Sequence, residues 1–227
     1  MKLALIGYGR MGKTIEKIAL NRQYNILFKT KNCPSYKEIK NVEIAIEFSQ
    51  PESAETNIKI CLEENISVIS GTTGWLFKMQ KIKNLCLIKS GTFLYASNFS
   101  IGVNLFFEIS RKFARLINHH KDGYEVEIEE IHHVNKKDAP SGTAIRIAKG
   151  ISKQWVLGEK KEQFSIISKR FKNIVGIHIV KYQSVIENII FKHIALTIEG
   201  FAIGVIIATE WILYKRGVFS MKDVIGI

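Results

Sequence analysis

The residues best suited to chemistry lie in one segment, 130–143, which reads E-I-H-H-V-N-K-K-D-A-P-S-G-T. Two histidines, two lysines and an aspartate precede a Pro-Ser-Gly-Thr turn. Imidazole and ammonium groups beside a turn with outward backbone N–H groups suit the binding and protonation of a small anion. Surface loops are often rich in Lys and Asp, so a solvated loop is the alternative. The combination of His-His-x-x-Lys with a Pro-Ser-Gly-Thr turn favours a functional site over a solvated loop.

Two elements must position this segment. Residues 124–131 form a strand-like run in which Glu125, Glu127 and Glu129 alternate with apolar residues, a pattern typical of a half-buried strand. A helix-like run, 143–151, follows. The turn therefore lies at a helix N-terminus, where backbone N–H groups bind anions.

A second candidate site lies near the start of the chain, where a G-x-G-x-x-G motif follows the apolar run 2–6 and opens a helical pattern. The first glycine permits a tight turn, the second lets a pyrophosphate approach the backbone, and the third allows close helix–strand packing. In this context the motif predicts a dinucleotide-binding domain. The predicted cofactor contacts of the loop are Gly7, Tyr8, Gly9, Arg10, Met11 and Gly12.

The position expected to bind the cofactor ribose carries no carboxylate, because residues 28–31 read F-K-T-K. A carboxylate there would hydrogen-bond the 2′-hydroxyl of NAD and repel the 2′-phosphate of NADP. Lysines would instead attract the 2′-phosphate of NADP. Lys29 is therefore predicted to contact the cofactor, and NADPH is expected to be used at least as well as NADH. The alternative is that Lys29 and Lys31 are simply solvated.

The hydrophobic pattern changes character near residue 100. Before it, apolar strands alternate with helical stretches, which predicts a parallel sheet with helices on both faces; after it, the strands predict a mostly antiparallel sheet. The expected strands are 2–6, 24–28, 42–48, 67–70, 85–88, 93–96, 124–131, 165–168, 174–182 and 184–195. The expected helices are 11–20, 51–65, 77–83, 103–118, 143–151 and 201–214, followed by a tail, 217–227.

Length and composition exclude several classes of protein. A chain of 227 residues with 46% apolar residues can bury a sizeable core. Its longest apolar run, 201–213, is too short to cross a bilayer, and the apolar start is too short for a signal peptide. The three cysteines, Cys33, Cys61 and Cys86, have no metal-ligand spacing. We therefore expect a cytoplasmic protein with reduced thiols, no metal site and no membrane partner.

The net charge of +12 raises the possibility of nucleic-acid binding. However, the basic residues are scattered and only seven of the 33 are Arg, the residue that such surfaces favour. A general bias toward Lys, Ile and Asn explains the charge more simply. No nucleic-acid partner is expected, although the charge would help to attract an acidic substrate.

Together these motifs resemble the 4-hydroxy-tetrahydrodipicolinate reductases, also called dihydrodipicolinate reductases, of bacterial lysine and diaminopimelate synthesis. The resemblance rests first on the glycine loop, the G-T-T-G turn at 71–74, the S-N-F-S-I-G-V-N run at 97–104 and the segment 130–143. The runs V-G-I-H at 175–178, F-A-I-G at 201–204 and M-K-D-V-I-G at 221–226 extend it to nearly the whole chain.

The resemblance implies an α/β protein of two domains. A Rossmann-type N-terminal domain with a parallel sheet, 1–101 with 200–227, would bind the dinucleotide. An α+β C-terminal domain with a mixed or antiparallel sheet, 102–199, would bind substrate and form a homotetramer.

The implied reaction is hydride transfer from NADPH or NADH to a cyclic unsaturated dicarboxylate, with a proton delivered to the neighbouring carbon. His132 and Lys136 match the catalytic pair, and His133 matches the substrate-binding histidine. The loop that binds a substrate carboxylate corresponds to Ser141, Gly142 and Thr143. The implied cofactor contacts beyond the glycine loop are Gly71, Thr72, Thr73, Ala96, Ser97, Asn98 and Phe99. Phe48 follows an expected strand and is therefore also predicted to lie near the cofactor.

Some assignments have rivals. Either histidine could be a core residue, and Lys137 adjoins Lys136, although the spacing from His132 favours Lys136. Asp138 is expected to fix the loop through local hydrogen bonds.

The chain also departs from the family pattern at two places. Ile177 stands where many members carry an acidic or polar residue, and Ile198 stands where an Arg is usual. Both departures concern subunit packing or substrate binding more than the reaction class. The rival functions are another NAD(P)-dependent imino-acid oxidoreductase of the same two-domain plan and a non-catalytic dinucleotide-binding protein.

Overall fold

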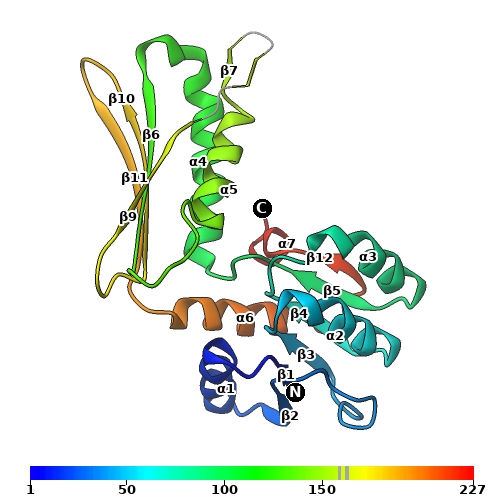
Figure 1. Cartoon of the computed structure of the whole chain (residues 1–227). Helices are drawn as coiled ribbons and strands as arrows, with labels where there is room; N and C mark the ends of the chain where they lie inside the picture. The colour runs from blue at the N-terminus through cyan, green and yellow to red at the C-terminus, as the bar shows by residue number, and fades with distance from the viewer. Residues whose placement is uncertain (158–159, 162–163) are drawn as a thin grey trace. The chain divides into compact units, whose positions relative to one another are not determined.

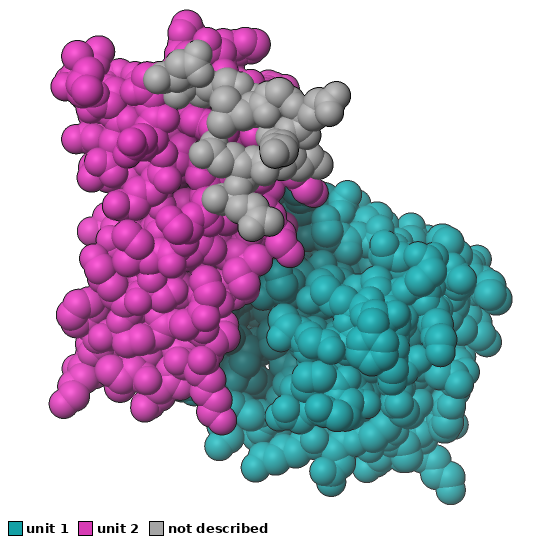
Figure 2. Space-filling view, turned by 45° about the horizontal axis from the view of Figure 1, so that its top comes forward, with its two compact units in different colours: residues 1–101, 199–227 teal, residues 102–198 magenta. Residues whose placement is uncertain are grey.

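The computed structural model describes residues 1–157, 160–161 and 164–227, and its elements are labelled in Figure 1. The chain divides into two compact units, coloured separately in Figure 2. Unit 1 comprises residues 1–101 and 199–227, and unit 2 comprises residues 102–198. Each unit has its own sheet and its own hydrophobic core.

Unit 1 contains a sheet of six parallel strands in the order β12-β5-β4-β3-β1-β2. The order reverses between β1 and β3, and ligands bind at the carboxyl ends of the strands beside such a reversal. The strands are β1 (Lys2–Ile6), β2 (Asn25–Thr30), β3 (Ile44–Glu47), β4 (Ser67–Ser70), β5 (Thr92–Tyr95) and β12 (Gly217–Phe219).

Helices cover both faces of this sheet. Because side chains alternate along each strand, neighbouring residues of β1 pack on opposite faces. Leu3 and Leu5 of β1 pack on the face covered by α1 (Arg10–Asn21), α6 (Glu199–Trp211) and α7 (Met221–Ile225). Ala4 and Ile6 pack on the face covered by α2 (Pro51–Glu63) and α3 (Met79–Ile88). Strands that are buried on both faces explain the continuous apolar runs of the N-terminal half.

Unit 2 contains a mixed sheet of four strands in the order β11-β10-β6-β9, with only β6 and β9 parallel. Two helices, α4 (Ile101–Ile117) and α5 (Gly142–Ser152), lie along one side of it (Figure 1). The core between them includes Ile128, Ile147 and Tyr182. The strands are β6 (Glu125–His132), β9 (Ile166–Arg170), β10 (Gly176–Gln183) and β11 (Asn188–Ala195).

Four short elements complete the described chain: β7 (Val156–Leu157), β8 (Lys160–Lys161) and the 3₁₀ turns η1 (Leu76–Lys78) and η2 (Asn118–Gly123). None of the described helices is long and apolar enough to cross a membrane.

The expected strand at 85–88 is wrong, because these residues continue α3. Ile82 and Cys86 are buried four residues apart, whereas Leu87 and Ile88 are 64% and 80% exposed. That is the exposure pattern of a helix, and four apolar residues in a row do not distinguish it from a strand. The tail contains two short elements that the pattern did not predict, β12 and α7.

Candidate active site

The glycine loop forms a tight turn between β1 and α1. Gly7 has φ 90°, and its N–H donates to the carbonyl of Thr30 on β2 at 2.8 Å. A side chain at Gly7 would overlap the backbone of Phe48, and a Cβ at Gly12 would lie 2.8 Å from the oxygen of Gly7. A Cβ at Gly9 would meet nothing within 4 Å. The second glycine therefore leaves the approach to the backbone open.

The first turn of α1 is available to an anion. Gly9 is the N-cap residue, and no side chain in the described part of the chain caps it. The first four N–H groups of a helix have no partner within the helix, and the helix dipole adds partial positive charge there. A phosphate group matches both properties.

Residues from three neighbouring strand ends meet beside this loop. The rings of Phe48 and Phe99 lie 5.6 Å apart between centroids, and any side chain at Gly71 would overlap the Phe48 ring. The Phe99 side chain belongs to the core of unit 1. Thr73 and Ser97 are exposed at the same strand ends.

Glu47 connects two of these loops through a fully buried carboxylate. It accepts hydrogen bonds from Ser70 Oγ at 2.6 Å, Thr72 Oγ1 at 2.9 Å and the Ser49 N–H at 2.9 Å. A buried charge is tolerated when it is hydrogen-bonded in this way. Sequence reasoning missed Glu47; the available signal was a carboxylate directly after the apolar residues of β3.

Lys29 is engaged by another side chain. Its Nζ donates to Glu16 Oε1 at 2.8 Å and lies 5.0 Å from the centre of the Tyr8 ring. The Tyr8 hydroxyl donates to the same carboxylate. The hydrogen bonds from Lys29 and Tyr8 lower the pKa of Glu16. A carboxylate therefore does lie beside the predicted ribose position, but it comes from α1, where sequence reasoning did not look.

In unit 2, β6 directs two ionisable groups toward the helices. Glu130 and His132 share the buried face of the strand with Ile128, while Glu129 points the other way and pairs with Lys169 at 2.9 Å. The alternation of the earlier glutamates predicts an outward Glu129. It also requires Glu130 to face inward, a consequence that sequence reasoning missed.

Glu130 uses its two oxygens differently. Oε1 accepts hydrogen bonds from the Ser141 N–H at 3.0 Å, Ser168 Oγ at 2.8 Å and Arg170 Nη2 at 3.3 Å. Oε2 lies 3.1 Å from His132 Nδ1. Burial alone would raise the pKa of Glu130, but the hydrogen bonds from Ser141 and Ser168 outweigh it and lower this pKa. The carboxylate is therefore ionised at neutral pH.

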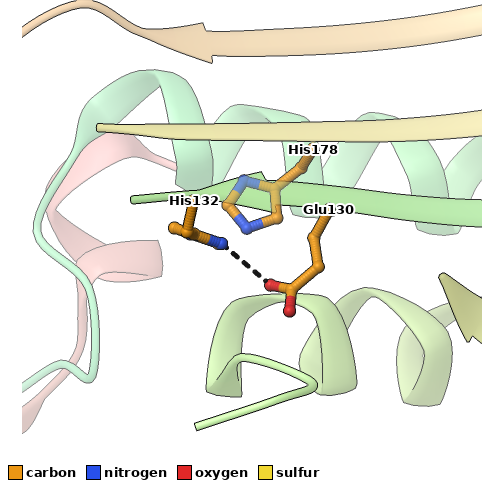
Figure 3. Close-up of side chains that lie close together, drawn as sticks. All are labelled: Glu130, His132 and His178. Carbon is orange, nitrogen blue, oxygen red and sulfur yellow. Dashed lines mark ion pairs between the residues drawn. The ribbon is translucent and has the colours of Figure 1, made fainter. Parts of the chain in front are cut away.

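His132 lies close to Glu130 and to a second buried imidazole, His178 (Figure 3). The two rings meet edge to face with centroids 5.1 Å apart. Burial lowers the pKa of His132, and the Glu130 carboxylate opposes that shift. Burial and the charge of His132 lower the pKa of His178 to about 4, so His178 is neutral.

Ligand atoms of Glu130, His132 and His178 lie within 4.8 Å of one another. The Arg170 guanidinium pairs with Oε1 of the same Glu130 carboxylate at 3.3 Å, and its positive charge disfavours a metal cation beside these groups.

The loop after His132 holds Lys136. Its Nζ pairs with Asp138 Oδ1 at 2.8 Å, and its N–H donates to the His133 carbonyl at 3.1 Å. Arg170 Nη2 donates to the Asp138 carbonyl at 2.7 Å and so ties the loop to β9. Lys136 is partly buried whereas Lys137 is exposed.

Helix α5 presents its N-terminus at the end of this loop. Ser141 is the N-cap, and its hydroxyl accepts from the Ala144 N–H at 3.1 Å. Ser141 is only 2% exposed, so its side chain serves the helix. Gly142 is exposed, and a Cβ there would meet nothing within 4 Å. The Asp138 carboxylate already accepts a hydrogen bond from the Gly142 backbone, so a second carboxylate that binds the first turn of α5 at Gly142 and Thr143 would share or replace this contact.

The fold and the two sites define a class of protein: a two-unit α/β protein with a Rossmann-type unit and a second unit in which ionisable groups lie near a helix N-terminus. Comparisons with known proteins give the family. The family model described as dihydrodipicolinate reductase, N-terminus, matches residues 1–99, and the model described as its C-terminus matches residues 102–225.

Curated relatives named 4-hydroxy-tetrahydrodipicolinate reductase match over nearly their full length. The relative from Christiangramia forsetii is 45% identical over 100% of this chain and 98% of its own, and that from Rickettsia rickettsii is 34% identical over 95% of each. A dipicolinate-bound dihydrodipicolinate reductase from Paenisporosarcina sp. TG-14 shares the fold with TM-score 0.79, 20% identity and 98% coverage of both chains. Aspartate dehydrogenase from Thermotoga maritima shares it at TM-score 0.52, with 16% identity over 95% of this chain and 97% of its own.

The chain belongs to the dihydrodipicolinate reductase family. It is therefore an oxidoreductase of diaminopimelate and lysine biosynthesis with an NAD(P)H-binding Rossmann-type unit.

Proposed function

We propose that this chain transfers a hydride from NADPH or NADH to the ring of 4-hydroxy-tetrahydrodipicolinate, whose hydroxyl group leaves as water before or during the transfer, to give tetrahydrodipicolinate. One observation carries the proposal at the level of residues. In unit 2, His132 and Lys136 flank one loop that ends at the accessible N-terminus of α5. Family membership over the whole chain supports the same reaction.

Unit 1 would hold the cofactor. The pyrophosphate would bind the open backbone at Gly9 and the first turn of α1. The nicotinamide end would lie at the carboxyl ends of β3, β4 and β5. The residues proposed for it there are Phe48, Gly71, Thr72, Thr73, Ala96, Ser97, Asn98 and Phe99. Because the side chains of Ala96 and Phe99 are packed in the core, their contacts would come from the backbone.

Unit 2 would hold the dicarboxylate. One carboxylate would bind at Gly142 and Thr143, with Ser141 contributing through the helix that it caps, and His133 would contact the ring or the second carboxylate. His132 and Lys136 would supply the proton to the carbon next to the one that receives the hydride. The cofactor brings the hydride chemistry, and these residues bind, orient and protonate.

The direct test couples the purified protein to a dihydrodipicolinate synthase with pyruvate and aspartate semialdehyde, and follows NADPH absorbance. Oxidation that depends on both the synthase and this protein is the expected result. If the protein binds NADPH or NADH but oxidises neither when each is tested under these conditions, the proposed reaction is rejected.

The engagement of Lys29 by Glu16 leads to a prediction about cofactor choice. Replacing Glu16 with Gln should free the Lys29 ammonium to meet a 2′-phosphate. We expect KM for NADPH to fall several-fold while KM for NADH changes little, as measured by steady-state kinetics with each cofactor. Adding one unpaired cation near a phosphate strengthens binding by electrostatic attraction.

Glu63→Gln is a matched control, because Glu63 also accepts from a tyrosine hydroxyl (Tyr36, 2.7 Å) and pairs with a lysine (Lys59, 3.7 Å). It should leave both KM values unchanged. Equal effects of Glu16→Gln on the two cofactors would reject a role for Lys29 at the 2′ position.

We also propose that the chain forms a homotetramer through the outward face of the unit 2 sheet. On that face Ile177 of β10 pairs with Ile131 of β6 on one side and with Ile194 of β11 on the other. Ile194 is 48% exposed. A row of isoleucines across three strands is an apolar surface of the kind that a second copy of the chain can cover.

Replacing Ile177 with Glu should place a charge in this row and reduce the oligomer to a smaller species, as measured by size-exclusion chromatography with light scattering. Ile88→Glu makes the same change at an 80% exposed isoleucine on α3 and should leave the mass unchanged. An unchanged tetramer in the Ile177→Glu variant would show that this face is not the interface.

The three cysteines are free thiols, and Cys61 and Cys86 are buried. Burial raises the pKa of Cys61 to about 12, which keeps this thiol unreactive. Three cysteines without a disulfide support our proposal that the protein works in the reducing cytoplasm.

A further inference from the structure

A row of polar side chains crosses the buried face of the unit 2 sheet. Glu130 of β6 pairs in register with Ser168 of β9 and with His178 of β10, and His178 pairs with His193 of β11. Two positions earlier along β6, the row through Ile128 is entirely apolar. A polar row inside an apolar core costs free energy unless its groups are satisfied or serve a function.

Glu130 is the best satisfied member of the row and also the one that links the two parts of the site. Through Oε1 it accepts the Ser141 N–H, which holds the residue that caps α5. Through Oε2 it lies 3.1 Å from Nδ1 of His132. These two atoms lie within hydrogen-bonding distance, although no hydrogen bond joins them in the described structure.

Two neighbours border the His132 ring, His178 and Gly176. The His178 ring packs against it edge to face, and a Cβ at position 176 would lie 3.1 Å from its Nε2. Gly176 therefore keeps the space beside Nε2 free of any side chain of its own. Nε2 is the nitrogen that faces this space, whereas Nδ1 faces the Glu130 carboxylate.

We propose that Glu130 is a positioning residue for proton transfer: it accepts the Nδ1–H of His132, which leaves Nε2 to exchange the proton with substrate, and the same carboxylate fixes Ser141 at the start of α5. This inference rests on the proposed function, in which His132 acts on the substrate. A carboxylate that fixes a histidine tautomer in this way acts through the imidazole and is not itself protonated.

The charges around His132 give the direction of the pH effect. Burial disfavours the protonated imidazole, as do Lys136 and Arg170, whereas Glu130 and Asp138 favour it. Removing the negative charge of Glu130 should lower the pKa of His132 further. The protonated form would then exist only at lower pH, so the limb of the kcat profile that reports it should move to lower pH.

The test compares Glu130→Gln with Glu129→Gln in the full-length protein with ¹⁵N-labelled histidine, in the presence of EDTA. Glu129 is the matched control, since it is the adjacent glutamate of β6 on the opposite face. Long-range ¹H–¹⁵N spectra report the tautomer and pKa of each imidazole, and the His132 signals are assigned by their loss in His132→Gln. Kinetics on the same samples give kcat and KM across pH.

In the wild type and in Glu129→Gln, neutral His132 is expected to carry its proton on Nδ1. In Glu130→Gln the Nε2–H tautomer should appear, the pKa of His132 should fall, and kcat should fall at least about tenfold. KM should change little, because the amide oxygen of Gln can still accept the Ser141 N–H. Glu130→Asp keeps the charge but draws it back by one methylene, so its kcat and His132 pKa should lie between those of the wild type and Glu130→Gln.

An unchanged tautomer and pKa of His132 in Glu130→Gln would overturn the inference, whatever happens to activity. If Glu130→Gln does not fold, Glu130→Asp decides: wild-type kcat and an unchanged tautomer there would equally overturn it. Failure of the proposed function would give a different result. The wild type would then not turn over the substrate, although the His132 spectra would still respond to a change at position 130.

Discussion

Replacing Lys136 with Ala should lower kcat by about 10²–10⁴-fold, the range that a positioned general acid contributes. The fold should persist, because the Lys136 side chain is 24% exposed, lies in a loop and pairs with an Asp138 side chain that is 55% exposed. Losing a partly exposed ion pair in a loop costs little stability. Steady-state NADPH oxidation and a thermal melt followed by circular dichroism measure the two effects.

Lys137 offers a matched control one position along the loop. Its side chain is exposed, and Lys137→Ala removes the same charge from the same loop. We expect its kcat to stay within a factor of two or so of the wild type, as for surface substitutions away from a site. Near-normal turnover in Lys136→Ala would reject the proposed role, and so would equal losses in both variants.

Replacing Gly204 with Ala should destabilise unit 1 by more than about 3 kcal/mol, beyond the usual cost of overpacking. Gly204 lies in α6, where an added Cβ would overlap the carbonyl oxygen of Phe99. A backbone atom cannot rotate away as a side chain can. Either α6 or the loop that contains Phe99 must therefore move. The loop concerned includes Ser97 and Asn98, which we propose as cofactor contacts, so KM for the cofactor should rise as well.

Gly200→Ala is the control on the same helix, because a Cβ at Gly200 would meet nothing within 4 Å. Ala is the better helix former by about 1 kcal/mol, so this variant should be neutral or slightly more stable. Urea unfolding followed by tryptophan fluorescence compares the two, since Trp75 and Trp211 report on unit 1. Equal midpoints for Gly204→Ala and Gly200→Ala would show that α6 and Phe99 do not approach so closely.

The glycine loop illustrates what the sequence could predict. The spacing of its glycines predicts a local turn, and the structure contains that turn. Gly7 has a positive φ, the space beside Gly9 is open, and Gly12 packs against the backbone of the loop. The alternation of strands and helices likewise predicts the parallel sheet of unit 1, because each pattern reflects burial of its own element. The family resemblance is confirmed over both units.

The features that the sequence could not predict depend on contacts between distant residues. The engagement of Lys29 depends on Glu16 of α1, and no spacing rule relates the two. The network of Glu130 combines donors from β9 and from the loop before α5, so it needs the register of β6 against β9. The expected strand at 85–88 was wrong for a local reason instead: four consecutive apolar residues are too few to show whether their period is that of a strand or of a helix.

The central claim is hydride transfer to the ring of the dicarboxylate, and an isotope measures it most directly. The protein should be supplied with NADPH that carries deuterium at C4, on the face that is transferred, together with substrate freshly made by the synthase. Mass spectrometry of the product should then show tetrahydrodipicolinate with one deuterium on a ring carbon, formed by the wild type and nearly absent with Lys136→Ala. Oxidation of the cofactor without deuterium in this product would contradict the account.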